Sequence, residues 1–292
     1  MQKYQKTMRV LLIIMALMAT IATKGNATTH GLTDDEAGRT ALLMVHFGTT
    51  HDDTRQLTID AVNNLARQDF PQAEVREAYT SRIVIKRLAQ RGIVRQTPLE
   101  ALLRLRADGF ERVVVQPTHI IPGEEYATLL NDVRQVEHLF KYVRVGKPLL
   151  YTLADCREMA GILTAAHATE KHTHVVFVGH GTEHPANAIY SQMDRLMKQC
   201  SPRCHVGTIE GFPALDDVVQ QLRQAKARCV VLVPLMFVAG DHAKNDISVE
   251  WKEALEKEGM QVQLCIEGLG QRADVQDLFV RHVREAMNDN KL

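Results

Sequence analysis

The sequence lacks an excess of charge of either sign. Its 292 residues include 35 basic Lys and Arg side chains and 35 acidic Asp and Glu side chains, so the formal net charge is +0. Proteins that bind nucleic acid or an anionic membrane surface carry a basic patch or a basic excess. The composition therefore gives no electrostatic support for either partner, and we expect no binding to nucleic acid.

The sequence also lacks, near its N-terminus, an apolar run long enough to cross a bilayer. Residues 10–22 form an apolar run of about 13 residues, whereas a membrane-spanning helix needs about 20. A basic segment, residues 3–9, precedes this run, and small residues follow it at 25–27. The pattern predicts a signal peptide over residues 1–27, cleaved on export to the periplasm, with no stable membrane anchor afterwards. An uncleaved anchor or a buried first helix is the alternative.

Cysteine is scarce, and the five cysteines include only one close pair, Cys200 and Cys204. An oxidising compartment would permit a disulfide across the short loop between them. A zinc site is disfavoured there because no second cysteine pair stands nearby. The other three, Cys156, Cys229 and Cys265, lie in apolar or helical contexts that are typical of buried thiols.

The signatures of three common enzyme classes are missing as well. The chain has no G-x-S-x-G elbow, no phosphate loop with G-K-[ST], and no G-x-G-x-x-G after a strand. Gly179 and Gly181 supply only the first two glycines of the last motif, and His180 between them would crowd a pyrophosphate. These gaps disfavour a serine hydrolase, a P-loop nucleotidase and a dinucleotide-binding enzyme.

What the chain does have is a series of eight Val-, Ile- and Leu-rich runs. Most of them do not alternate between apolar and polar residues, which is typical of parallel strands buried on both faces. Between them lie stretches with helical spacing, as in residues 54–67, 216–225 and 249–258. This alternation predicts a doubly wound α/β fold. The expected strands are residues 41–47, 74–79, 112–116, 143–149, 174–178, 205–209, 229–234 and 262–266.

The two halves of the chain share one plan. The first strand of each half ends in a related motif, VHFGT at 45–49 and VGHGT at 178–182. We therefore predict two similar α/β lobes with parallel sheets around a central cleft. Residues 28–160 would form the N-terminal lobe and residues 161–292 the C-terminal lobe, with a helix over residues 155–169 at the join.

Three residues that are suited to metal binding follow apolar runs of the second half: His180, Glu210 and His242. The carboxyl ends of parallel strands meet at one edge of a sheet, so we expect these side chains to lie together there. Two imidazoles and a carboxylate suit a borderline divalent metal. A site with three protein ligands also leaves coordination positions open, as a catalytic site requires.

Each of these residues also has a structural interpretation. A lone histidine at a strand end, such as His180, is often held there by hydrogen bonds. Glu210 would be stabilised as a negative charge at a helix N-terminus, and His242 would cap the helix that follows it. Their shared placement in one half favours the joint metal site over three separate explanations.

Three further histidines are candidates for contacts with the substrate. His184 stands four residues after His180, but a glycine turn lies between them and Pro185 follows, so we favour a role beside the substrate over metal ligation. His46 and His119 belong to the first half. From there they are expected to line the opposite wall of the cleft.

The motifs together resemble those of the class II chelatases, and most closely those of the anaerobic sirohydrochlorin cobaltochelatases. The resemblance covers nearly the whole chain after the predicted signal, and its most specific part is GHGT at 179–182 followed by AGDHA at 239–243 with a glutamate between them. It implies two α/β lobes around a tetrapyrrole cleft. It also implies that His180 and His242 bind the metal and that Glu210 is the acidic ligand.

The resemblance implies insertion of a divalent metal, Co²⁺ first and Fe²⁺ second, into a sirohydrochlorin-type tetrapyrrole with release of two protons. The metal is then a substrate, and no organic cofactor is expected. Apolar residues such as Phe47, Leu235, Met236 and Phe237 would either pack on the macrocycle or belong to the core, and Arg55 and Arg82 are candidates for its carboxylates by their placement in loops.

Two questions stay open at this stage. A periplasmic carrier that binds metal, haem or another tetrapyrrole without turnover would use the same ligands and is the alternative to an enzyme. A homo-oligomer is compatible with the sequence but is not indicated by it. Chelatases of this kind usually serve cytoplasmic cofactor synthesis, so the predicted export sets this chain apart.

Overall fold

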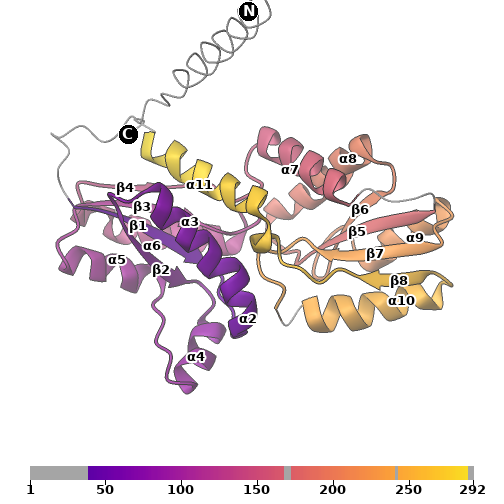
Figure 1. Cartoon of the computed structure of the whole chain (residues 1–292), viewed down its shortest axis with the longest axis horizontal. Helices are drawn as coiled ribbons and strands as arrows, with labels where there is room; N and C mark the ends of the chain where they lie inside the picture. The colour runs from indigo at the N-terminus through magenta and orange to yellow at the C-terminus, as the bar shows by residue number, and fades with distance from the viewer. Residues whose placement is uncertain (1–38, 168–171, 241–242, 289–292) are drawn as a thin grey trace, which may run out of the picture. The chain divides into compact units, whose positions relative to one another are not determined.

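The computed structural model describes residues 39–167, 172–240 and 243–288. Over these residues the chain forms two four-stranded parallel sheets, ordered β2-β1-β3-β4 and β6-β5-β7-β8 (Figure 1). The predicted α/β fold with two similar parallel sheets is confirmed. The strands are β1 (Thr40–His46), β2 (Glu74–Tyr79), β3 (Arg112–Pro117), β4 (Tyr142–Val145), β5 (Thr173–Gly179), β6 (Cys204–Thr208), β7 (Cys229–Pro234) and β8 (Gln261–Leu264).

Helices follow nearly every strand, as expected for a doubly wound chain. The first half holds α2 (Asp52–Arg55), η2 (Gln56–Asp60), α3 (Ala61–Asp69), α4 (Arg82–Gln90), α5 (Pro98–Ala107), α6 (Glu124–Val136), η3 (Glu137–Leu139) and α7 (Leu153–Ala166). The second half holds η4 (Pro185–Asn187), α8 (Ala188–Cys200), α9 (Leu215–Gln224), η5 (Ala243–Trp251), α10 (Lys252–Lys257), η6 (Leu269–Gln271) and α11 (Ala273–Asn288). Within the described residues, no helix has the length and apolarity that a membrane span requires.

Both faces of the sheets are covered by helices, which explains why the strand sequences do not alternate. In β1, Leu43 and Val45 pack with residues of α5 and α6, whereas Leu42 lies in the cluster on the opposite face, with α3 and α11. That second cluster also contains Phe177 of β5. One apolar core therefore continues from the first sheet to the second.

Local side-chain chemistry decides where some elements begin and end. α5 begins at a capping box in which Glu100 accepts a hydrogen bond from Thr97 N at 2.8 Å, an arrangement that stabilises a helix by about 1 kcal/mol. β4 is shorter than the predicted strand over 143–149 and ends at Val145. There the Gln116 side chain donates to Lys147 O at 2.9 Å and draws the chain out of the sheet.

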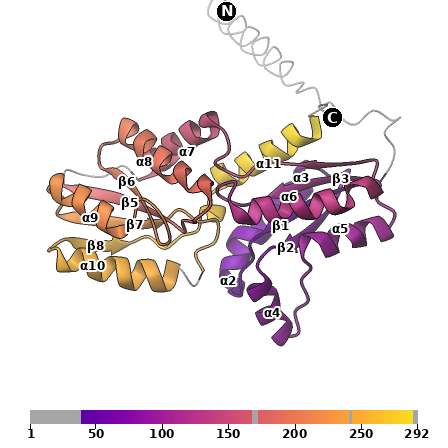
Figure 2. The ribbon, with the colours of Figure 1, turned by 180° about the vertical axis from the view of Figure 1, so that it is seen from behind.

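The last helix of each half packs on the opposite half (Figures 1 and 2). α7 follows β4 in the sequence but packs against α8, while α11 follows β8 and packs against α3 and β3. Arg281 of α11 joins the two helices through hydrogen bonds of 3.0 and 2.6 Å to the Glu158 carboxylate of α7. We call this arrangement the helix exchange.

The helix exchange bears on the predicted lobes. The expected boundary between residues 160 and 161 falls inside α7, and the chain from Arg39 onward forms one compact unit. The boundary and the extents of the two lobes stay predictions. The predicted signal peptide, residues 1–27, lies outside the described residues.

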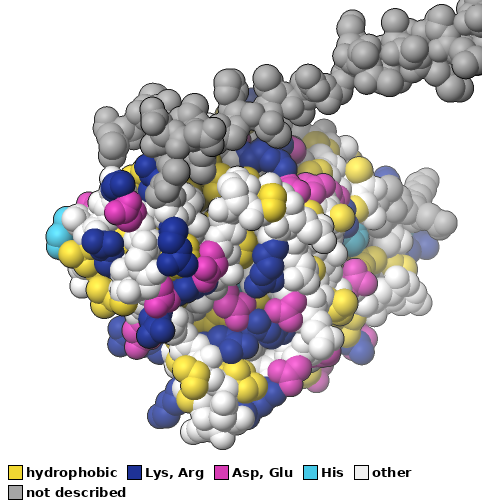
Figure 3. Space-filling view, turned by 60° about the vertical axis from the view of Figure 1, so that its left-hand side comes forward, with side chains coloured by type: hydrophobic (Ala, Val, Ile, Leu, Met, Phe, Trp, Pro, Cys, Tyr) yellow, Lys and Arg dark blue, Asp and Glu magenta, His cyan; other side chains and the backbone are white. Residues whose placement is uncertain are grey.

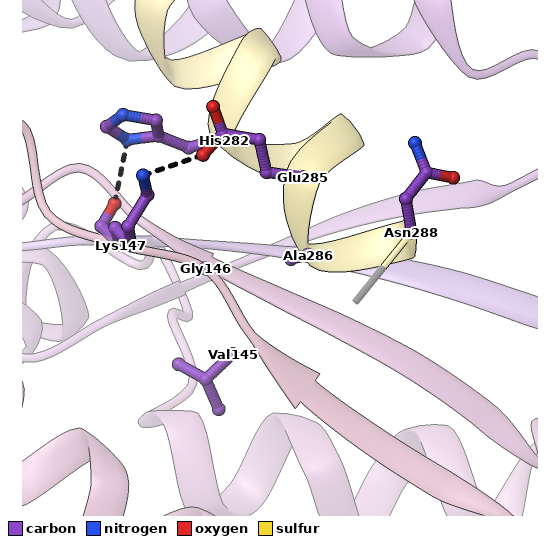
Figure 4. Close-up of a pocket in the computed structure, with 7 residues that line it drawn as sticks. All are labelled: Val145, Gly146, Lys147, His282, Glu285, Ala286 and Asn288. Atoms are coloured by element: carbon purple, nitrogen blue, oxygen red, sulfur yellow. Dashed lines mark hydrogen bonds and ion pairs between the residues drawn. The ribbon is translucent and has the colours of Figure 1, made fainter. Parts of the chain in front are cut away.

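A pocket of about 360 Å³ lies where α11 meets the loop after β4 (Figure 4). Lys147 Nζ is 2.7 Å from the Glu285 carboxylate, and His282 Nδ1 donates to Lys147 O at 3.1 Å. Burial, with Lys147 nearby, lowers the pKa of His282, so this ring is neutral at pH 7. Lys147 thus joins His282 and Glu285, and we interpret the pocket as part of the helix exchange.

Candidate metal centre

His180 stands immediately after β5, one of the two central strands of the second sheet. The next residue, Gly181, has φ +82°, a backbone conformation that residues other than glycine adopt only with strain. A Cβ at Gly181 would also collide with the backbone oxygen of Glu210. The glycine lets the chain turn sharply and leaves the His180 side chain 41% exposed.

Glu210 is held beside His180 by the backbone. The Glu210 N–H donates to His180 O at 2.7 Å, and the Ile209 N–H donates to Gly179 O at 3.0 Å. These bonds continue the β5–β6 pairing beyond the ends of both strands. As a result His180 Nδ1 and Glu210 Oε2 lie 3.9 Å apart, and the Glu210 side chain is 65% exposed. The predicted neighbourhood of His180 and Glu210 is therefore present in the structure.

The hydrogen bonding of His180 favours metal binding through one nitrogen. Its Nδ1 lies 3.1 Å from the carbonyl oxygen of Gly181. A carbonyl can only accept, so Nδ1 carries the proton and Nε2 of the neutral ring carries the lone pair. A hydrogen bond that fixes the tautomer in this way is usual for histidines that bind metals.

The third expected ligand cannot be placed, because His242 lies outside the described residues. Among the residues that are described, no group of three or more His, Cys, Asp and Glu side chains is arranged to hold a metal ion. The described chain thus supplies two of the three expected ligands, His180 and Glu210. The full ligand set stays a prediction.

His184 lies on the same loop but is oriented for another task. The Ala186 N–H donates to His184 Nδ1 at 3.1 Å, where the ring caps the start of η4. Nδ1 is therefore an acceptor, and in the neutral ring the proton is on Nε2. A metal would have no lone pair to bind, which agrees with our preference against ligation. The substrate contact that we predict for His184 is not tested.

His46 lies inside the protein at the end of β1. Its Nε2 is 3.1 Å from Asn63 Oδ1, and its Nδ1 is 2.9 Å from Thr118 Oγ1. The ring stacks on Phe237 of the second half, with centroids 6.0 Å apart. Burial lowers the pKa of His46 to about 3, so the ring is neutral. A direct contact between His46 and a substrate would require this packing to open.

His119, which follows β3, is also buried, but neither of its ring nitrogens has a hydrogen-bond partner among the described residues. Burial, and the nearby His46, lower its pKa to about 4. Phe237 is only 8% exposed and also meets Phe279 of α11 edge-on. The roles of His46, His119 and Phe237 in substrate binding stay predictions, and all three are core residues in this conformation.

The other expected contacts divide by exposure. Leu235 is fully buried, whereas Phe47, which follows β1, is 43% exposed. Phe47 is thus better placed than Leu235 for contact with a macrocycle.

Arg55 already has ion-pair partners within the protein. Its guanidinium lies 2.8 Å from the Glu77 carboxylate and 2.9 Å from the Asp60 carboxylate. Figure 3 shows basic and acidic side chains interspersed over the face of the first half.

Sequence reasoning missed two residues that support the centre, both near the start of α8. Tyr190 is buried behind β5, where a Cβ at Gly179 would collide with its ring. Its pKa is raised to about 12 by burial, against a backbone hydrogen bond from Gly181. Asn187 joins the His180 loop to the Glu210 loop.

The two cysteines that stand close together in the sequence, Cys200 and Cys204, are both free thiols.

The fold is chelatase-like. A solved structure titled SirB from Bacillus subtilis with Fe³⁺ matches with a TM-score of 0.63 at 15% identity, covering 86% of this chain and 96% of that chain. At this identity the likeness concerns the fold.

The family follows from the sequence comparisons. The model of the cobalt chelatase (CbiK) family matches residues 40–288, and the chain belongs to that family. A sirohydrochlorin cobaltochelatase of Salmonella typhimurium is 35% identical over 254 residues, covering 85% of this chain and 96% of the relative. The sirohydrochlorin cobaltochelatase CbiKC of Nitratidesulfovibrio vulgaris is 32% identical over 255 residues, covering 85% and 90%. The resemblance read from the motifs is confirmed.

Proposed function

We propose that this protein is a sirohydrochlorin cobaltochelatase, an enzyme that inserts Co²⁺ into sirohydrochlorin and releases two protons. The observation that carries the proposal is the pair formed by His180 and Glu210 at the end of β5, 3.9 Å apart, in a chain of the cobalt chelatase family. Two relatives that align with this chain over at least 90% of their own length are named sirohydrochlorin cobaltochelatases.

The first task of the centre is to hold the metal with positions left open. His180 Nε2 and the Glu210 carboxylate would bind Co²⁺, and His242 is the proposed third ligand. Imidazole and carboxylate donors suit first-row divalent ions, and a centre with three protein ligands leaves room for ring nitrogens to replace water. Both described side chains are exposed enough to meet a substrate from outside.

The second task is to take up two protons. Each pyrrole N–H of the macrocycle must lose its proton as a nitrogen binds the metal. As Co²⁺ passes to the ring, it leaves the lone pairs of His180 and Glu210, which become available as bases at that moment. Transfer of the metal and uptake of the protons are then coupled through the same two side chains, by positioning and without a covalent intermediate.

The choice of metal and the location are separate proposals. We favour Co²⁺ over Fe²⁺ because both curated relatives are named as cobaltochelatases. The donor set itself does not distinguish the two ions, since divalent affinities follow a general order. We also propose export to the periplasm, supported by the basic and apolar segments of residues 1–27. Fractionation of cells expressing the full chain, with N-terminal sequencing, tests this location.

The decisive experiment follows Co²⁺ insertion into sirohydrochlorin by absorbance, with the purified protein and with His180→Ala, Glu210→Ala and His242→Ala. We expect many turnovers, and a loss of at least about 100-fold in kcat/KM for each variant, because the metal is no longer held in position. His138→Ala, at an exposed histidine of η3, is the matched control and should retain full activity. Tight binding of Co²⁺ or sirohydrochlorin with no acceleration would instead indicate a carrier.

A further inference from the structure

The side chain of Asn187 connects the two loops that carry His180 and Glu210. Its Oδ1 accepts a hydrogen bond from the Thr182 N–H at 3.2 Å, and its Nδ2 donates to Phe212 O at 2.8 Å. Thr182 lies two residues after His180, and Phe212 lies two residues after Glu210. One amide therefore spans the loops just beyond the two proposed ligands.

The amide of Asn187 is free to make this connection because the residue does not cap a helix. Asn187 is the last residue of η4 and leads directly into α8 with a helical backbone, φ −55° and ψ −28°, whereas a capping residue is extended. The start of this helical segment is capped by His184 instead. The Asn187 side chain is directed toward the two loops.

The Glu210 loop is shaped to receive this amide. Gly211 lies between Glu210 and Phe212, and a Cβ at Gly211 would come within 2.5 Å of Asn187 Oδ1. A residue with a side chain at Gly211 would push the amide away. The glycine and the asparagine thus fit each other, which a general surface contact would not require.

The first half of the chain shows the same turn with a different residue at this place. The Thr49 hydroxyl accepts from the His51 N–H at 3.1 Å, just as the Thr182 hydroxyl accepts from the His184 N–H at 3.1 Å. Counting onward from this turn puts Thr54 where the second half has its amide. The Thr54 hydroxyl lies 3.5 Å from a carboxylate oxygen of its neighbour Asp53. The turn recurs in both halves, but the amide connection belongs to the half with the metal ligands.

We propose that Asn187 is a positioning residue, which fixes the separation between His180 and Glu210 so that both reach one Co²⁺ ion. The proposal rests on the proposed function for the identity of the ion. Asn187 itself does not bind the metal in this scheme. It acts through the backbone of the two loops, whose relative position its amide sets.

Two substitutions separate positioning from other effects. Asn187→Ala removes both hydrogen bonds and leaves the ligands unchanged. Asn187→Asp keeps an acceptor for the Thr182 N–H but loses the donor, so a carboxylate oxygen faces Phe212 O. The added negative charge alone would tighten the binding of a cation, whereas a disturbed ligand geometry weakens it. The two effects thus predict opposite changes for the aspartate variant.

The test measures Co²⁺ affinity by titration, together with the visible absorption spectrum of the Co²⁺-loaded protein without tetrapyrrole, which reports ligand geometry. We expect about tenfold weaker Co²⁺ binding and an altered spectrum for Asn187→Ala and for Asn187→Asp, the size usual for residues that orient metal ligands. Circular dichroism and thermal unfolding confirm that each variant is folded. Asn131→Ala, at an exposed asparagine of α6, is the matched control and should leave both readouts unchanged.

The outcomes are distinct. Unchanged affinity and spectrum in folded Asn187→Ala, or tighter binding with an unchanged spectrum in Asn187→Asp, would overturn the positioning role. If Asn187→Ala does not fold, the aspartate variant decides alone. If the unsubstituted protein binds Co²⁺ but does not insert it into sirohydrochlorin, the proposed function fails while the affinity and spectrum still test the role of Asn187.

Discussion

The two halves of the molecule share one backbone at the ends of their central strands and differ in the side chains placed on it. Gly48 and Gly181 take up the same left-handed turn, with φ +99° and +82°. The matching backbone hydrogen bonds run from Thr80 N to His46 O and from Ser81 N to Phe47 O in the first half, and from Ile209 N to Gly179 O and from Glu210 N to His180 O in the second. Each half thus offers the same two positions at one sheet edge.

The difference lies in what fills these positions. Phe47 stands where the second half has His180, and Ser81 stands where it has Glu210. In the same way, His119 corresponds to Met236. The His119 carbonyl oxygen accepts a hydrogen bond from Leu149 N at 2.9 Å, after β4, and the Met236 carbonyl oxygen accepts one from Leu269 N at 2.8 Å, after β8. The shared frame decides where a side chain lies, and the residue type decides whether the edge can bind a metal.

Exchanging one residue between the halves should give the largest effect. His180→Phe places the first half's residue at the second half's position, and we expect kcat/KM for Co²⁺ insertion to fall at least about 100-fold. Folding should be preserved, since Phe47 already occupies this backbone conformation. The measurement is absorbance-monitored Co²⁺ insertion, with thermal unfolding alongside. The reciprocal Phe47→His should create no second Co²⁺ site, because Ser81 supplies no carboxylate. Activity within twofold of the unsubstituted protein would remove His180 from the site.

Alanine substitutions at Gly48 and Gly181 should separate the loss of folding stability caused by the turn from the loss of Co²⁺ binding at the site. Gly48→Ala would drive a Cβ into the Tyr79 ring, and Gly181→Ala would drive one into the Glu210 backbone oxygen. We expect each substitution to lower the free energy of unfolding by roughly 1–3 kcal/mol, measured by urea denaturation, because both backbones are left-handed. Only Gly181→Ala should also weaken Co²⁺ binding in a titration. Equal losses of Co²⁺ affinity in both variants would contradict the separation.

The smallest effect is expected at the buried histidine of the first half. The pKa of His119 is about 4 in the folded protein, below the value of 6.5 that applies to an exposed ring. Between these two values the unfolded chain takes up a proton that the folded one does not, so stability falls as the pH falls. His119→Met, which inserts the second half's residue, should reduce this loss by about 1.4 kcal/mol per pH unit at most.

Urea denaturation between about pH 7 and about pH 5 measures the loss of stability, within the window where the His119 ring is neutral only in the folded state. His138→Met, at an exposed histidine, is the control and should keep the slope of the unsubstituted protein. An unchanged slope in His119→Met would mean that the ring of His119 is not held neutral by burial.

Much of the fold could be predicted from the sequence because strand formation depends on local runs of residues. The strands over Glu74–Tyr79 and Cys229–Pro234 have the predicted bounds. The edge shared by His180 and Glu210 was also predictable, since both follow strands that a parallel sheet brings together. These inferences needed only the order of the elements along the chain.

What could not be predicted depends on contacts between distant segments. His46 is the last residue of β1, whereas His180 follows the last residue of β5. His46 therefore lies one position earlier in the shared frame, opposite Tyr79, as Gly179 lies opposite Thr208. One position turns a side chain from the edge into the core, and Phe237 of the other half closes over it. The amide connection of Asn187 likewise joins loops whose meeting has no signal in the local sequence.

The helix exchange has a consequence for the integrity of the chain. α7 belongs to the first half of the sequence but packs on the second half, whereas α11 belongs to the second half of the sequence but packs on the first. Neither half is therefore a self-sufficient module, because each would leave behind the helix that completes its partner's core. The polypeptide resembles two subunits that have swapped an arm and been fused end to end, so its halves should unfold as a single cooperative unit.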